Sequence, residues 1–228
     1  MAQLYIMLSR TGTGMGKIIR LFTHNHYNHV SLTLDDEFRS FVSFARYAQD
    51  VPLAGGFVTE PAERFLSDGK AVPVRIFCLN ISDAERNALS ALFSLADRRD
   101  TGLIYNSLGA LMSTWRIPCP IAGSYTCLEF ASAILGQRFS SLQALEKALS
   151  PYLYYEGELS ALKADTGKRN APYFHQRGFW RGTGDTLLHF ARLLCKILRI
   201  SKCHDPITEY AKEKTGLPVL NCSCKNGQ

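Results

Sequence analysis

The segment 29–44, HVSLTLDDEFRSFVSF, encodes an antiparallel hairpin. Its first half alternates polar and apolar residues, as a half-buried strand does, and FRSFVSF follows as the return strand. Between the two halves, Asp35–Glu37 supply a polar turn. His29 opens the first strand on its polar face, opposite the face that carries Val30 and Leu32. A hairpin of this kind commits the chain to an antiparallel sheet with one face turned to a core.

Other segments extend this pattern. The apolar runs Gln3–Ser9 and Val72–Leu79 are typical of strands, and a helix is expected over Lys17–Thr23. A capping-box sequence, Ser-Asp-Ala-Glu, predicts a helix over 82–98, and 105–114 is expected to be helical as well. The order strand, helix, hairpin, strand, helices predicts an α+β fold with a central antiparallel sheet packed on helices.

The composition is that of a globular protein with a basic surface. Of its 228 residues 46% are hydrophobic, which is enough for one sizeable core. A net charge of +6 suits an anionic partner, but no pattern indicates nucleic acid, and we expect no such partner. No run approaches the roughly 20 apolar residues that span a bilayer, and no basic segment precedes the apolar N-terminus. We therefore expect a cytoplasmic protein, associated with membranes only through its C-terminal helix, whose seven cysteines are free thiols.

One cysteine lies where a helix should begin. In SYTCLEFASAILG, Thr126 is a good N-cap and Gly136 a good C-terminal stop, so Cys127 falls in the first turn. The unpaired N–H groups and the positive dipole end of that turn stabilise a thiolate, the reactive form of cysteine. An imidazole completes the pair, because it accepts the thiol proton and later returns it to a leaving group. His29, at a rigid strand start, is the expected partner, and the expected site contains neither a metal nor another cofactor.

The order of a histidine hairpin followed by a cysteine helix resembles a known branch of proteins. The segments YIMLSRTGTGMGKIIRLFT, NHVSLTLDDEFRSFVSFAR and YTCLEF are similar to the opening strand, the histidine hairpin and the nucleophile helix of the circularly permuted NlpC-type papain-like superfamily. That branch of cysteine peptidases and amidases includes lecithin retinol acyltransferase-like enzymes and uncharacterised bacterial members. The resemblance covers about residues 3–160, although Leu128 stands where serine is common.

The resemblance implies a papain-like fold and a cysteine hydrolase or acyltransferase acting on an amide or ester. The substrate class would be a peptide, a peptidoglycan stem or a lipid. It assigns Ser43 to the position that orients the imidazole, with Glu60 and Asp36 as substitutes from loops. It also implies that Tyr125 adds a hydroxyl to the backbone N–H of Cys127 in holding an oxyanion.

Two other functions fit parts of the sequence. The spacing of His24, His26 and His29 resembles the HxHxDH zinc motif of metallo-β-lactamases, but Asn28 replaces its acidic residue. A zinc-dependent hydrolase is therefore one alternative. A non-catalytic binding module of the papain-like fold is the other, because Ser43 orients an imidazole more weakly than a carboxylate would.

The C-terminal part is expected to be separate from the catalytic domain. We predict a catalytic domain over 1–182, followed over 183–228 by a basic amphipathic helix and a tail. In the helix at 185–200, basic side chains recur at helical spacing among leucines. This stripe comprises His189, Arg192, Lys196 and Arg199. We expect the helix to pack on the domain with the stripe in solvent; contact with an anionic membrane surface is the alternative.

Overall fold

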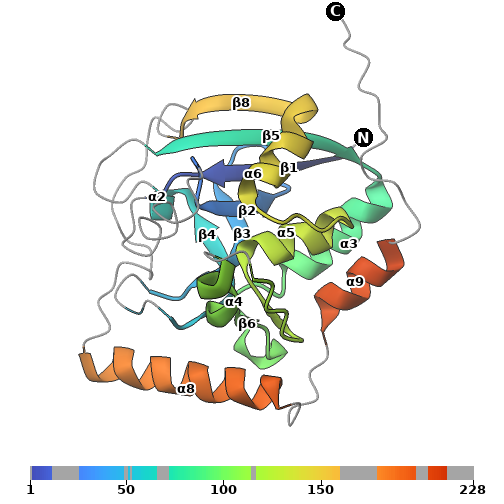
Figure 1. Cartoon of the computed structure of the whole chain (residues 1–228). Coiled ribbons are helices and arrows are strands. Elements are labelled where there is room, and N and C mark those ends of the chain that lie inside the picture. The colour runs from blue at the N-terminus through green and yellow to red at the C-terminus, as the bar shows by residue number, and fades with distance from the viewer. Residues whose placement is uncertain are drawn as a thin grey trace, which may run out of the picture.

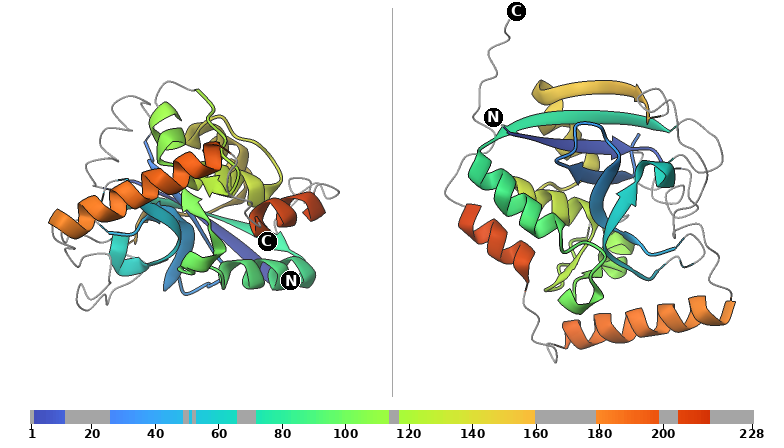
Figure 2. Two further views of the ribbon diagram at one scale, coloured as in Figure 1. Left: turned by 90° about the horizontal axis from the view of Figure 1, so that it is seen from below. Right: turned by 180° about the vertical axis from the view of Figure 1, so that it is seen from behind.

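An eight-stranded sheet forms the centre of the protein (Figure 1). The computed structural model describes residues 2–11, 26–48, 51, 53–65, 72–113, 117–159, 179–198 and 205–214. The strands are β1 Ala2–Ser9, β2 His29–Thr33, β3 Ser40–Arg46, β4 Gly55–Pro61, β5 Pro73–Ile81, β6 Ile104–Tyr105, β7 Ser124–Tyr125 and β8 Leu153–Glu158. Their order across the sheet is β7-β6-β4-β3-β2-β1-β5-β8. All neighbours are antiparallel except β6 and β7, and the sheet curls strongly (Figure 2).

Seven α-helices surround the sheet in the described part of the chain. They are α2 Ala62–Phe65, α3 Asp83–Phe93, α4 Ser107–Met112, α5 Cys127–Leu135, α6 Leu142–Leu149, α8 Phe179–Ile197 and α9 Pro206–Lys214. The predicted α+β class is therefore confirmed. The helix expected over 17–23 lies outside the described residues.

The predicted hairpin is present as β2 and β3. Leu32 pairs with Val42, and the carboxylate of Asp35 holds the turn by accepting hydrogen bonds from backbone N–H groups that follow it. The alternation of side chains then separates two faces. Val30 and Leu32 belong to the main core, which also contains Phe130 of α5. On the opposite face β2 carries His29, Ser31 and Thr33, and β3 carries Ser43 together with Phe41 of a second apolar cluster.

Helix α5 begins and ends where the sequence indicates. Thr126 accepts a hydrogen bond from the N–H of Glu129, whose carboxylate accepts one in return from the N–H of Thr126. Gly136 ends the helix with φ of 64°, a left-handed conformation that disfavours other residues. These two caps fix Cys127 as the first residue of the helix. Phe130 and Ile134, on the buried side of the helix, anchor it in the main core.

The C-terminal helices differ from the prediction. Helix α8 runs across the expected boundary at 182/183, and α9 contributes Ile207 and Tyr210 to the main core. On α8 the basic stripe is in solvent only in part: Arg192 is exposed as expected, but His189 is 4% exposed and packs toward the domain, and Arg199 lies outside the described residues. No helix among the described residues combines the length and apolar character needed to cross a membrane.

Candidate functional site

Cys127 occupies the first turn of α5 as a free, half-buried thiol. That turn leaves backbone N–H groups without partners inside the helix, and the helix dipole is positive there. The thiol therefore lies at the positive end of the helix dipole. The residue is partly exposed, unlike the buried side chains of the main core.

His29 is the first residue of β2, so its ring lies at the end of that strand. Nε2 lies 2.7 Å from Oε2 of Glu60, and the histidine side chain is 13% exposed. Cys127 is near enough to the imidazole to contribute to the raised pKa of His29. Because Nε2 is engaged by the carboxylate, Nδ1 is the ring nitrogen that remains for the thiol. The structure thus brings the two predicted residues together from β2 and α5.

Glu60 lies in the extended backbone of β4, opposite Phe41 of β3, and not in a loop as expected. Its carboxylate accepts a hydrogen bond from the hydroxyl of Ser43 and lies 3.2 Å from Nε of Arg64. Only 3% of the side chain is exposed. Such a carboxylate would be unstable alone, but an imidazole, a guanidinium and a hydroxyl surround it. We call His29, Ser43, Glu60 and Arg64 the buried charge cluster.

The charges in this cluster reinforce one another. Burial alone would lower the pKa of His29, but the negative charge of Glu60 and hydrogen bonds with Cys127 and Glu60 raise it. Burial alone would raise the pKa of Glu60, but the charges of His29 and Arg64 and hydrogen bonds with His29 and Ser43 lower it. The pair is therefore imidazolium and carboxylate at neutral pH. An imidazolium beside a cysteine favours the thiolate.

Ser43 lies on β3 between the two charged partners. Its hydroxyl donates to Glu60, and its Oγ is 3.4 Å from Nε2 of His29. The residue expected to orient the imidazole therefore acts mainly by holding the carboxylate that does so. Asp36, the other expected substitute, is exposed in the turn after β2.

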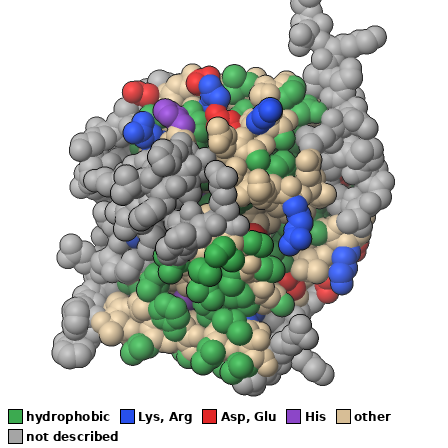
Figure 3. Space-filling view, in the orientation of Figure 1, with side chains coloured by type: hydrophobic (Ala, Val, Ile, Leu, Met, Phe, Trp, Pro, Cys, Tyr) green, Lys and Arg blue, Asp and Glu red, His purple; other side chains and the backbone are tan. Residues whose placement is uncertain are grey.

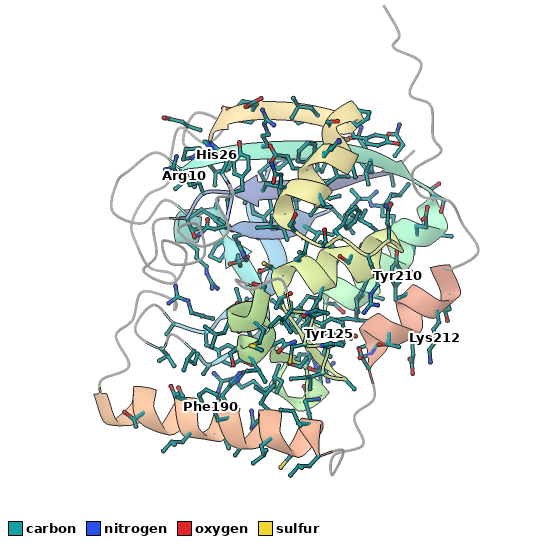
Figure 4. The ribbon with its side chains drawn as sticks, viewed as in Figure 1. Arg10, His26, Tyr125, Phe190, Tyr210 and Lys212 are labelled. Carbon is teal, nitrogen blue, oxygen red and sulfur yellow. The ribbon has the colours of Figure 1, made fainter. Side chains whose placement is uncertain are left out.

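Tyr125 differs from its predicted role. Its hydroxyl donates to Oδ2 of Asp205 at 2.7 Å and lies 2.9 Å from Oγ1 of Thr208. Both partners belong to the start of α9, next to which Tyr125 is labelled in Figure 4. Tyr125 therefore ties α9 to the domain, and its hydroxyl is already engaged.

A second tyrosine, Tyr105, was not identified from the sequence as a site residue. It lies on β6, paired in register with Tyr125 of β7. Burial, and then the negative charge of Cys127, raise the pKa of Tyr105, so its phenol stays protonated and can donate a hydrogen bond. Asn106 could have indicated the position of Tyr105 in the sequence. Its side chain caps the start of α4, so Tyr105 lies in the extended backbone just before that helix.

The histidines proposed to bind zinc are not gathered around one point in the part of the chain that is described. His24 lies outside the described residues, and His26 is exposed and stacks edge-on against Tyr27. Asn28, at the acidic position of the motif, uses its amide to hold the backbone N–H and C=O of Thr11. Among the described residues no group of three or more potential ligands lies close enough to hold a metal.

The chain shows no significant match to any family model, curated protein or solved structure. The chemistry assigned to this site therefore rests on its own geometry.

Proposed function

We propose that the protein is a cysteine-dependent hydrolase or acyltransferase of permuted papain-like fold, with Cys127 as nucleophile. One observation carries the proposal: His29 lies between the Glu60 carboxylate, 2.7 Å from Nε2, and Cys127, which is near enough to raise the pKa of the imidazole. A buried imidazole held by a carboxylate and facing a helix-start thiol is the arrangement that activates a cysteine.

In the first step the sulfur of Cys127 attacks the carbonyl carbon of an amide or ester. A C–S bond forms, and the C–N or C–O bond to the leaving group breaks. His29, as imidazolium, gives its proton to the departing amine or alcohol. Glu60 keeps the ring oriented through Nε2 and stabilises its positive charge, while Arg64 balances the charge of the carboxylate.

The negative oxygen formed during attack needs hydrogen-bond donors. The backbone N–H of Cys127 is one, because the first turn of α5 leaves it without an intrahelical partner. We assign the second to the hydroxyl of Tyr105, in place of Tyr125, whose hydroxyl is held by α9. Two donors of this kind match the usual composition of an oxyanion hole.

The second step releases the acyl group from sulfur. Neutral His29 removes a proton from water, or from an acceptor alcohol or amine, which attacks the thioester carbon. The C–S bond breaks and the thiolate re-forms beside the imidazolium. Peptides, peptidoglycan stems and lipid esters are the substrate classes that the sequence resemblance suggests.

Trapping of an acyl-enzyme tests this function. An activated aryl ester incubated with the purified protein should add one acyl group, detected by intact-protein mass spectrometry and peptide mapping to Cys127. Cys195→Ser is the matched control, because Cys195 is an exposed free thiol on α8. The adduct should persist in Cys195→Ser and disappear in Cys127→Ser. Equal acylation of all three proteins would remove Cys127 as the nucleophile and leave a binding module of the same fold.

A further inference from the structure

The outward side of α8 is apolar, the reverse of the usual arrangement for a surface helix. His189 and Leu193 pack toward the domain and are 4% and 2% exposed, whereas Leu187 and Leu194 are 66% and 55% exposed. A helix on a soluble domain normally buries its leucines and leaves its polar side chains in water. Here α8 contacts the domain through a narrow side that includes His189 and Leu193, and most of its leucines are exposed.

The exposed apolar residues lie along one continuous stripe. Leu187, Phe190, Leu194 and Leu198 recur at spacings of three or four residues, so they share one side of the helix, and each is 43% exposed or more. Leu111 of α4 is also exposed, at 48%. In Figure 3 hydrophobic side chains gather over α4 and α8 on the same side of the molecule. We call Leu111, Leu187, Phe190, Leu194, Ile197 and Leu198 the apolar surface.

Single exposed leucines are common, but a contiguous group of this kind marks a surface that something covers. The stripe follows a helix of 19 residues, which is about 28 Å long and too polar on its inner side to enter a bilayer fully. An amphipathic helix of this type lies in the plane of a membrane, with its apolar side among the acyl chains.

Charge complementarity identifies the occupant. The chain carries a net charge of +6, which favours an anionic surface. Anionic lipids attract a protein of net positive charge to the membrane surface, where an exposed apolar stripe can enter the interface. A second copy of this chain would instead bring two net positive molecules together. We propose that the apolar surface docks on a lipid bilayer containing anionic lipids. This docking depends on α4 and α8 alone and is independent of the chemistry assigned to Cys127.

Vesicle flotation of the full chain tests the docking. Wild-type protein should float with vesicles of phosphatidylcholine and phosphatidylglycerol, and much less with phosphatidylcholine alone. The triple substitution Leu187→Gln, Phe190→Gln, Leu194→Gln should abolish flotation. Raising the salt concentration should weaken binding to the anionic vesicles, as expected for attraction between a basic protein and anionic lipids. Leu153→Gln is the matched control, because Leu153 is an exposed leucine (46%) on β8, and it should float like wild type.

Circular dichroism of each variant checks that the fold is retained, which is expected because the substituted side chains are exposed. Absence of flotation by the wild type, or equal flotation by the triple variant, would overturn the proposal. Light scattering after size-exclusion chromatography tests whether a second copy of the chain occupies the apolar surface instead. A wild-type dimer that the triple substitution converts to monomer would assign the apolar surface to a second copy and contradict membrane docking.

Discussion

Two groups of charged side chains lie on the sheet, and their surroundings differ. In the buried charge cluster the three charged side chains are at most 13% exposed. Toward the β8 edge of the sheet Arg75 of β5 meets Glu146 of α6 at 2.5 Å and Glu156 of β8 at 2.7 Å, with side chains 20–49% exposed. Exposed pairs contribute little and need no special explanation, whereas buried charges are costly unless fully paired. A fold retains such a cost most readily where it supports a function.

The largest expected difference is in the free energy of unfolding when one carboxylate is replaced in each group. Glu60→Gln removes the negative charge opposite His29 and Arg64 and should destabilise the protein by about 3–5 kcal/mol, since a buried cation is left unpaired. Glu156→Gln should cost less than about 1 kcal/mol, because its side chain is 49% exposed. Urea denaturation of both variants measures the two free energies of unfolding. Equal destabilisation by the two substitutions would contradict the difference drawn between the buried charge cluster and the exposed ion pairs of Arg75.

Tyr105 and Tyr125, which pair across β6 and β7, are expected to differ in their effects on the acylation rate and on stability. Tyr105→Phe should slow acylation by an activated ester about 100-fold, the usual loss for one oxyanion donor, with little change in stability. Tyr125→Phe loses hydrogen bonds to Asp205 and Thr208, so it should cost about 1 kcal/mol of stability and leave the acylation rate nearly unchanged. Stopped-flow acylation and urea denaturation separate the two effects. The reverse pattern would return the donor role to Tyr125.

The dependence of stability on pH should also distinguish the buried cluster. The pKa of Glu60 is lowered, so its contribution is present above its ordinary pKa near 4.5 and is lost as pH falls through the folded-state pKa. The pKa of His29 is raised, so its contribution is present below its ordinary pKa of 6.5 and is lost as pH rises through the folded-state pKa. The stability difference between wild type and Glu60→Gln should therefore be largest at intermediate pH. A difference that stays constant from acid to alkaline pH would contradict the ion pair.

Ser43→Ala is the smallest expected effect within the cluster. It removes one hydrogen bond to Glu60 while the imidazole and guanidinium remain, so the cost should be about 1 kcal/mol. The acylation rate should fall less than tenfold, as for a residue that positions Glu60 without touching the reactant. A loss as large as that of Glu60→Gln would make Ser43, not Glu60, the main orienting group.

Local signals in the sequence account for much of the fold. The caps at Thr126 and Gly136 and the capping box at Ser82 use residues within a few positions, and the structure has the helices where they indicate. Cys127 and His29 were found the same way, because a helix start and a strand start are local features. Each end of the candidate pair could thus be proposed before its partner was placed.

The parts that the sequence did not reveal depend on distant contacts. Glu60 lies between the glycine pair at 55–56 and Pro61, so the sequence suggested a loop, and pairing with β3 makes it a strand residue beside His29. Tyr105 approaches Cys127 because β6 pairs with β7 across the chain. The periodicity of α8 predicted a helix correctly, but which side would be buried depended on the surface it packs against.

The central claim is that His29 and Glu60 activate Cys127, and alkylation of individual cysteines measures this most directly. Mass spectrometry follows iodoacetamide labelling at pH 6, where an unperturbed thiol is less than about 1% ionised. Cys127 should react about 10- to 100-fold faster than the exposed Cys195 of the same molecule, and His29→Ala should remove that advantage. Equal labelling of Cys127 and Cys195 in the wild type, or an advantage unchanged in His29→Ala, would contradict the account.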